Sequence, residues 1–486
     1  MTNASKCCLS WLAWLLVTVS AVVARAEGGT EGELTALLQS GDLLGHPDRA
    51  ARRGPVWERT AGRTTGRENL LRFGLSRADL GALRDVRTLA RLRFELAPLG
   101  AGGAPMLRDL SSFVGLSWKA APAARLELRA FPFDTDYLRI GWLHALDWGG
   151  TDRVRRESVF GGQAGGAPGA LITLQLPRVR WFLGTKWANA GAQSGGARVW
   201  GALGGASIDL SESLRVDSGL GYFQRPTLAS VSVGSPSAGQ GSDFVEGASL
   251  RLVWHRGPSE PELAAEPLRP APLRAESESF VAEQTPGASV AIEVVTLVSR
   301  LRRFDDARAQ VLSAAPAAGL SASLRGRALA LHVALTWRSV PFVVKDDARV
   351  AADRALPPDA AQQPEIAAWL GGSFTTTFGL VSALELGLEL PAALQTPSAI
   401  RGYSQSFVAG GVAGFEPLPP GSARLPIVAA RVSARLPLSA AVALAAWADY
   451  LRDPNLTELR ASGLGLGRSF AAPDRLQLSV ALQTRF

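Results

Sequence analysis

Apolar and polar residues alternate with a period of two along most of the chain. In the run from 329 to 337, the odd-numbered positions are Leu329, Leu331, Val333, Leu335 and Trp337, whereas the even-numbered positions are smaller or polar. Successive side chains of a strand point to opposite faces, so this run predicts a strand with one apolar and one polar face. The same alternation recurs in the segments 114–118, 125–129, 138–142, 172–176, 181–183, 206–216, 250–254, 290–294, 380–390, 428–436 and 476–486.

Residues 27–105 do not follow this alternation throughout. Leu34, Leu37 and Leu38 have helical spacing, as do the apolar residues between Leu80 and Leu89. We therefore predict that 27–105 is a periplasmic or lumen-filling segment with short helices or irregular structure. A first strand is predicted to begin near Ala90, where alternation starts.

The chain ends on the amphipathic run Leu476 to Phe486, whose last residue is aromatic. This end resembles the terminal strand of Gram-negative outer-membrane β-barrel proteins. The resemblance implies an outer-membrane location, outer-membrane lipid as a partner, and recognition of the last strand by the barrel-assembly machinery. A second stretch, Phe131 to Gly150, is similar to segments of uncharacterised deltaproteobacterial outer-membrane proteins.

The N-terminus has the features of a secretory signal peptide. Lys6 precedes an apolar run from Leu9 to Val23, and Ala24-Arg25-Ala26 forms a small-x-small cleavage site. Residues 1–26 are therefore predicted to be removed, leaving a mature chain that begins near Glu27. An uncleaved anchor is the alternative, but the run is about fifteen residues and a spanning helix needs about twenty.

The chain is 47% hydrophobic, yet no other apolar stretch is long enough for a membrane helix. A membrane protein without such a stretch has to span as a closed barrel, because lipid leaves no partner for unpaired backbone groups. The prediction is an all-β, transmembrane, antiparallel up-and-down β-barrel of roughly sixteen strands over residues 106–486. A soluble β-sandwich explains the alternation equally well and remains the alternative fold.

Both cysteines precede the predicted cleavage site, which excludes a disulfide-stapled fold and a cysteine metal site in the mature chain. No two histidines are close in sequence, so no local zinc motif exists and no cofactor or metal is predicted. A loop calcium site built on Asp134, Asp136, Asp147 and Asp152 is an alternative without regular spacing. The four histidines are His46, His144, His255 and His332.

His144 shares the parity of Trp142 and Leu146, which predicts a lipid-facing position near a rim. Outer-membrane phospholipases use a histidine and a serine there, but no matching serine and asparagine set surrounds His144. We therefore predict that the protein is not an enzyme, with a phospholipase-like hydrolase as an alternative. The formal charge of +8 without a basic helix or aromatic-basic motif argues against nucleic-acid binding.

The parity of the strands assigns side chains to the two faces of the barrel. The predicted outward aromatic residues at the membrane interface are Trp118, Trp254, Trp337 and Phe486. Nine cations and six anions are predicted to face the lumen, an excess of three positive charges. The cations are Arg125, Arg129, Arg139, Arg215, Arg251, Arg431, Arg435, Arg475 and Arg485, and the anions are Glu127, Asp209, Asp217, Glu293, Glu385 and Glu389.

These features predict a passive or weakly anion-selective outer-membrane channel for small polar solutes. A non-conducting structural or adhesion barrel that acts through long extracellular loops is the alternative, followed by a hydrolase or a secretion component. The long segments 224–242, 257–284 and 345–364 are predicted to lie outside the cell. The pattern of residues does not indicate an oligomeric state.

Overall fold

The computed structural model describes most of the predicted strands and part of the connections between them. The described residues are 30–39, 43, 70–78, 86–97, 106–109, 112–133, 138–144, 146, 167–189, 198–226, 242–257, 286–302, 309–344, 355–356, 358–395, 406–410, 414–419, 421–439, 441–462 and 465–485. The predicted signal peptide, His46 and Phe486 lie outside them, as do Asp134, Asp136, Asp147 and Asp152 of the calcium alternative.

One antiparallel sheet of 19 strands dominates the described part of the chain. Its strands are β1 (Thr30–Gln39), β2 (Leu70–Ala78), β3 (Val86–Ala97), β4 (Met106–Asp109), β5 (Phe113–Ala121), β6 (Ala124–Phe131), β7 (Gly169–Gln175), β8 (Val179–Asn189), β9 (Arg198–Asp209), β10 (Leu214–Pro226), β11 (Ser242–Arg256), β12 (Gly287–Arg302), β13 (Gln310–Arg325), β14 (Leu329–Arg338), β16 (Glu365–Thr375), β17 (Val381–Leu390), β21 (Ile427–Pro437), β22 (Val442–Arg452) and β25 (Asp474–Arg485).

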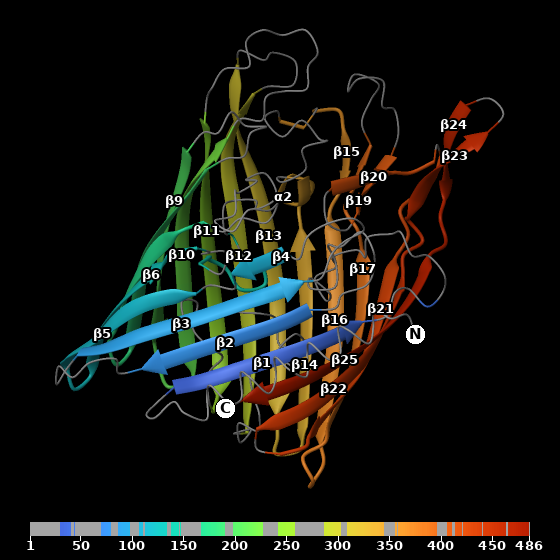
Figure 1. The fold of residues 1–486 in the computed structure, drawn as a ribbon. Helices are drawn as coiled ribbons and strands as arrows, with labels where there is room; N and C mark the ends of the chain where they lie inside the picture. Colours follow the sequence, from blue (N-terminus) through green and yellow to red (C-terminus); the bar gives the residue numbers. More distant parts are fainter. Residues whose placement is uncertain are drawn as a thin grey trace.

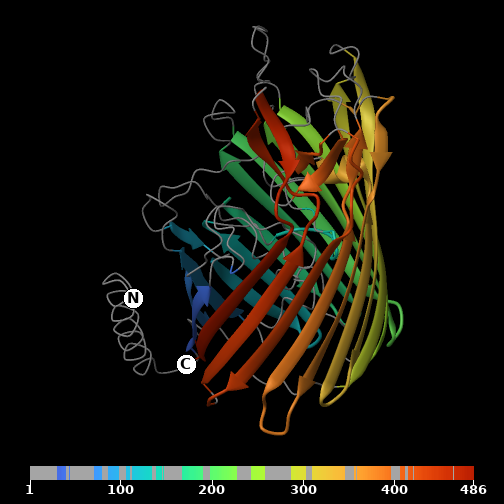
Figure 2. The same cartoon turned by 90° about the vertical axis from the view of Figure 1, so that its right-hand side faces the viewer.

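The sheet closes on itself. Strand β1 pairs with β2 on one side and with β25 on the other, where Leu37 lies opposite Ala481. Strands β4 and β5 pair with successive parts of the same edge of β3, so they occupy one position and the ring has eighteen. A closed ring leaves no edge with unpaired backbone groups. Figure 1 shows β1, β25 and β22 side by side, and Figure 2 shows how the strands tilt along the wall.

The predicted all-β barrel is confirmed, with eighteen strand positions where roughly sixteen were expected. The difference arises in residues 27–105, whose described parts form β1, β2 and β3 and not helices. Leu34, Leu37 and Leu38 all lie in β1. Their helical spacing is overridden by backbone pairing with β2 and β25, which a short window of sequence does not show. The strand expected near Ala90 is β3, which begins at Val86.

The outer face carries the apolar side chains that alternation predicted. Leu331, Val333 and Leu335 of β14 are 40 to 47% exposed, although they are large and apolar. Their neighbours in β13 and β16 on the same face, such as Leu320 and Leu370, are also exposed. Such a continuous apolar surface suits lipid and would be costly in water.

Aromatic residues border this apolar surface. Trp118 and Trp254, on the outer face of β5 and β11, are 48 and 47% exposed. At the other end of the strands, Tyr222 contacts Trp200 and Phe244 with ring centroids 5.4 and 5.0 Å apart. Between Phe244 and Trp254, a strand that rises about 3.3 Å per residue and tilts by about 40° spans about 25 Å. This height equals the apolar band expected of an outer-membrane barrel.

The two ends of the barrel differ in their connections. Short turns join β5 to β6, β7 to β8 and β9 to β10 at the end where β25 finishes, which we call the turn end. The opposite end, here the loop end, holds longer connections. The segment 257–284 was predicted to lie with the long loops, but β11 ends at Arg256 and β12 begins at Gly287 at the turn end, where His255 N donates to Ser213 O. The end of the barrel at which a connection lies therefore follows from the order of the strands and not from the length of the connection.

Several loop-end connections form ordered structure of their own above the wall (Figure 1). Asn455 ties two of these connections together, since its side chain accepts from Leu425 N at 2.7 Å and donates to Leu425 O at 2.8 Å. Among the described residues no helix is long and apolar enough to cross a membrane. The added elements are α2 (Val340–Val344), β15 (Ala361–Gln363), β18 (Ala393–Gln395), β19 (Ser406–Gly410), β20 (Gly414–Pro417), β23 (Thr457–Ser462) and β24 (Gly465–Phe470).

Candidate functional site: a segment folded into the barrel

The connection between β6 and β7 enters the barrel. Its described residues 138–144 and 146, here called the inner segment, do not form the outward-facing strand that their alternation predicted. Ile140 and Leu146 are 0 and 1% exposed, and Trp142 and His144 are also buried. Ile140 and Leu146 exchange two backbone hydrogen bonds of 3.0 and 2.7 Å, so the inner segment is a hairpin with its tip near residues 142–144.

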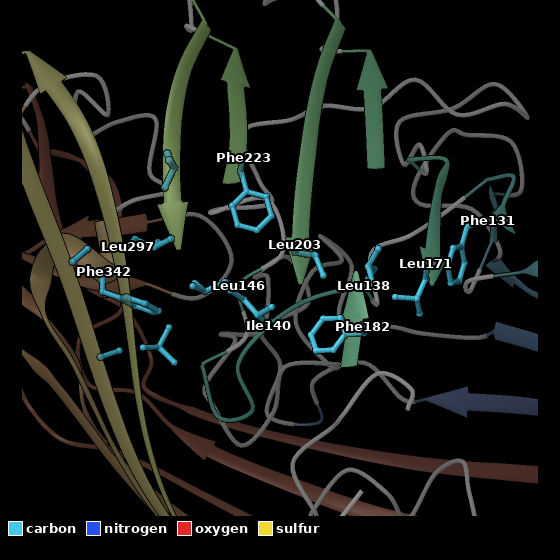
Figure 3. Packing of buried hydrophobic residues seen from close by; sticks show 14 of the residues in the cluster. Phe131, Leu138, Ile140, Leu146, Leu171, Phe182, Leu203, Phe223, Leu297 and Phe342 are labelled. Carbon is cyan, nitrogen blue, oxygen red and sulfur yellow. The ribbon is translucent and has the colours of Figure 1, made fainter. Parts of the chain in front are cut away.

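An apolar patch on the inside of the barrel receives this hairpin. Figure 3 shows Leu138, Ile140 and Leu146 among side chains that project inward from the strands. Full burial of a leucine or isoleucine contributes about 1.5–3 kcal/mol, so this packing favours the inserted position. We call the patch the apolar wall; it consists of Phe113, Phe131, Leu171, Phe182, Leu203, Phe223, Val245, Val295, Leu297, Ala315 and Ala317, with Phe342 of α2 beside it.

Glycines in the wall make room for the hairpin. A Cβ at Gly219 of β10 would lie 2.8 Å from Cβ of Ile140, and one at Gly247 of β11 would lie 2.9 Å from Leu146 Cδ1. Leu138 lies over Gly184 of β8, and Leu143 lies over Gly319 of β13 in the same way. Each of these glycines is on the inward face of its strand, so the wall lacks side chains where the hairpin rests.

Glu293 of β12 holds the tip of the hairpin. Its carboxylate accepts backbone N–H groups from Trp142 and Leu143, both at 2.9 Å, and from His144 at 3.3 Å. Hydrogen bonds to a charged acceptor are stronger than neutral ones. Gly141 has φ +81°, which lets the chain turn so that consecutive N–H groups point at one carboxylate. Glu293 is 1% exposed, so these donors replace water around its charge.

The side chain of Trp142 rests on a charged row in the wall. The guanidinium of Arg251 lies 4.2 Å from the centroid of the Trp142 ring, a cation–π distance. Arg251 also forms an ion pair of 3.3 Å with Asp217, and it lies directly opposite Glu293 in the sheet. The row therefore alternates carboxylate, guanidinium and carboxylate across β10, β11 and β12.

Two further contacts fix the base and the tip of the hairpin. The ammonium of Lys186, which is 0% exposed, donates to Leu138 O at 2.8 Å. His144 Nε2 lies 2.9 Å from Ala318 O, and its imidazole meets Phe342 edge to face at 5.7 Å. The prediction that His144 faces lipid is therefore wrong, because the segment turns into the barrel.

The opposite part of the inner face is polar. Arg431 of β21 donates to both carboxylate oxygens of Asp449 of β22, from Nε at 2.5 Å and from Nη2 at 2.9 Å. Glu385 of β17 lies directly opposite Arg431 on the other side. We call this region the polar wall; its inward-facing residues include Glu385, Arg431, Ser433, Arg435, Trp447, Asp449, Arg475, Gln477, Ser479 and Gln483.

The structure places most predicted lumen residues on the face opposite the apolar band. Arg215, Arg251, Arg431 and Arg475 are buried there, Glu385 and Glu389 lie on the same face of β17, and Arg125 lies beside the turn end of β6. Arg139 belongs to the inner segment and not to a strand, and the side chain of Arg485 lies outside the described part. The ion pairs formed by predicted cations include Arg129–Glu127, Arg215–Asp209, Arg251–Asp217 and Arg431–Asp449.

Sequence reasoning missed three residues that shape the lumen. Asp449 and Trp447 share an inward parity in β22, which the alternation of Val442, Leu444 and Ala446 with their neighbours indicates in retrospect. Lys186 follows the inward parity of β8 in the same manner. Within the described ranges, no three histidine, cysteine, aspartate or glutamate side chains gather in a way that could hold a metal ion.

Comparison with known proteins gives structural matches only. No family model matches the chain, and no curated protein matches it. The Pseudomonas aeruginosa protein OpdL is 11% identical with a TM-score of 0.45, covering 94% of this chain and 98% of its own. OpdQ of the same organism is 8% identical with a TM-score of 0.44, covering 95% and 99%. An anion-selective porin from Comamonas acidovorans is 11% identical with a TM-score of 0.38, covering 94% and 98%.

The architecture follows from the chain's own pairings and surfaces. Its antiparallel sheet closes into a ring, its outer face is an apolar band bordered by aromatic residues, and a connection folds into its lumen. Outer-membrane barrels have this combination of features. The chain therefore folds as a closed antiparallel β-barrel with an apolar outer band.

Proposed function

We propose that this protein is a narrow passive channel that carries small polar solutes across the outer membrane. The observation that supports it best is the one-sided position of the inner segment. The hairpin rests on the apolar wall between β8 and β13, whereas the polar wall displays charged and hydroxyl side chains. A lumen with one apolar side and one polar side offers polar solutes a path along the polar wall.

Mild anion selectivity is the finer part of this proposal. The two charged residues that the sequence prediction missed cancel in the predicted count of inward-facing charges, because Asp449 adds one negative charge to the inward face and Lys186 adds one positive charge. Arg435 of β21 lies four residues beyond Arg431, toward the turn end and on the same face. Its positive charge, together with that of Arg475, favours anions near the polar wall.

Reversing the charge of Arg435 tests both parts of the proposal. Wild-type protein in a planar bilayer should conduct, and in a salt gradient its reversal potential should indicate a slight preference for anions. Arg435→Glu changes the inner charge by two units and should move that potential toward cations. The shift should shrink in concentrated salt, because the screening length falls from about 10 Å at 0.1 M to about 3 Å at 1 M.

The matched control is Arg256→Glu, since Arg256 is exposed on the outer face of β11, at the last position of this strand. It should leave the reversal potential unchanged. Equal shifts in the two variants would show that Arg435 does not line the conduction path. Folded wild-type protein that never conducts would overturn the channel proposal.

The ordered loop end favours a second candidate function, a structural or adhesion barrel. Arg424 donates to the carbonyl oxygens of Pro364 and Pro391, both at 2.6 Å, and thereby joins two connections. Burial lowers the pKa of Arg424, but a guanidinium stays charged at physiological pH. Thr457 donates to Pro417 O and brings β23 against β20. This candidate requires a stable outer surface and no conductance.

The position of His144 argues against the phospholipase-like hydrolase, because that alternative depended on this residue. An outer-membrane phospholipase needs a catalytic histidine at the lipid face, and His144 lies inside the barrel with its Nε2 at Ala318 O. The absence of an enzyme function and recognition by the barrel-assembly machinery through β25 remain part of the proposal.

A further inference from the structure

Trp447 of the polar wall has a buried polar group that its described neighbours do not satisfy. It lies on the inward face of β22 and is 9% exposed, packed beside Ala445 and Ala481. Its indole Nε1 is buried and has no hydrogen-bond partner. A buried donor without a partner costs about 1–3 kcal/mol, so a protein rarely keeps one without a reason.

A second unpartnered group lies next to it. Ser479 of β25 is directly opposite Trp447 in the sheet, and its Oγ is also buried without a hydrogen-bond partner. Side chains in opposite positions of paired strands have Cβ atoms about 4.5–5.5 Å apart. On the other side of Trp447, Ser433 of β21 is its direct neighbour. The indole is therefore flanked by two hydroxyl groups.

The next row toward the loop end adds charged groups of both signs. It contains Glu385, Arg431, Asp449 and Gln477, and Arg431 forms a bidentate ion pair with Asp449. Because the row has one more carboxylate than guanidinium groups, it does not favour an anionic ligand at this place. This part of the wall presents donors, acceptors and an aromatic ring within two adjacent rows.

We infer that the wall formed by β21, β22 and β25 carries a subsite for a neutral hydroxylated ring, such as a saccharide. Hydroxyl groups both donate and accept, which matches the indole N–H, the serine Oγ and the amide of Gln477. The C–H face of a sugar ring is apolar enough to lie against an indole. This inference rests on the proposed channel function, because it names the solute class that the same lumen would admit.

Saturation-transfer NMR with maltose tests the inference without requiring conductance. Detergent-solubilised full-length protein, shown to be folded by its heat-dependent migration on gels, should transfer saturation to maltose protons. Trp447→Phe keeps an aromatic ring but removes the donor, and it should weaken binding about fivefold, which corresponds to about 1 kcal/mol. Ser479→Ala should weaken it by a similar factor, and Trp447→Ala should abolish the transfer.

Trp369→Phe is the matched control, because Trp369 is another buried, inward-facing tryptophan, on β16. It should bind maltose as wild type does. Absence of transfer in folded wild-type protein would overturn the inference, as would unchanged binding in both Trp447→Phe and Ser479→Ala. Binding of maltose by a barrel that does not conduct would contradict the channel proposal and leave the subsite standing.

Discussion

Replacing Val333 or Leu335 with Arg will prevent most of the protein from assembling into a barrel in the outer membrane. Both side chains lie on the outer face of β14 and are 45 and 47% exposed within the apolar band. An arginine on the lipid face near the midplane costs about 2–4 kcal/mol, a large share of the stability of a typical domain. The folded fraction is measured by comparing gel migration before and after boiling in detergent.

Ala334→Ser is the control for this experiment. Ala334 lies between the two tested residues in β14 but faces inward, where it is 4% exposed beside Trp369. A serine is close to alanine in size, so we expect nearly normal assembly. If Ala334→Ser were as damaging as the arginine variants, both faces of β14 would belong to a packed core, and a soluble sandwich would explain the chain better.

Replacing Glu293 with Ala will release the inner segment from the wall. The substitution removes the acceptor for three backbone N–H groups, those of Trp142, Leu143 and His144. A loss of about 3 kcal/mol is expected from such bonds, which shifts the balance between seated and released hairpin about a hundredfold. Because the seated hairpin occupies space inside the barrel, its release should raise the single-channel conductance and increase the fluctuations of that conductance.

Glu246→Gln provides the comparison, since Glu246 lies on neighbouring β11 but is exposed on its outer face. It should leave conductance unchanged. Glu293→Gln should be intermediate, because an amide oxygen can still accept but carries no charge. Unchanged conductance in folded Glu293→Ala would mean that this carboxylate does not hold the constriction.

The faces of the strands could be predicted from the sequence because a strand alternates regardless of its partners. The residues of β14 and the last strand show this most clearly: their apolar and polar positions follow directly from parity. The number of strands was predicted less accurately than their faces. The register that joins Leu37 of β1 to Ala481 of β25 is a long-range pairing, and the local spacing of apolar residues does not indicate it.

The inner segment shows why alternation alone cannot assign a wall position. Leu138, Ile140 and Trp142 alternate as a strand would, but they lie on a hairpin with one face against the apolar wall. The space for these side chains is left by glycines far away in the sequence, such as Gly219 and Gly247. These glycines can be recognised as the hairpin's binding surface only when the register of the strands is known. Likewise, Glu293 was assigned to the lumen by parity, but its role as an acceptor for the hairpin depends on a connection 149 to 151 residues earlier.

The central claim is that the inner segment, residues 138–144 and 146, lies inside the barrel against the apolar wall. It can be tested by a disulfide between Ile140→Cys and Gly219→Cys in a chain whose Cys7 and Cys8 are removed. Cβ of Ile140 would lie 2.8 Å from a Cβ at 219, and a disulfide needs about 3.5–4.5 Å, which a small displacement of the hairpin supplies. Mass spectrometry of unreduced peptides from folded protein should find this bond. It should find no bond in the pair Ile140→Cys and Gly372→Cys, because Gly372 lies on the outer face of β16. A folded barrel with no link between positions 140 and 219 would contradict the account.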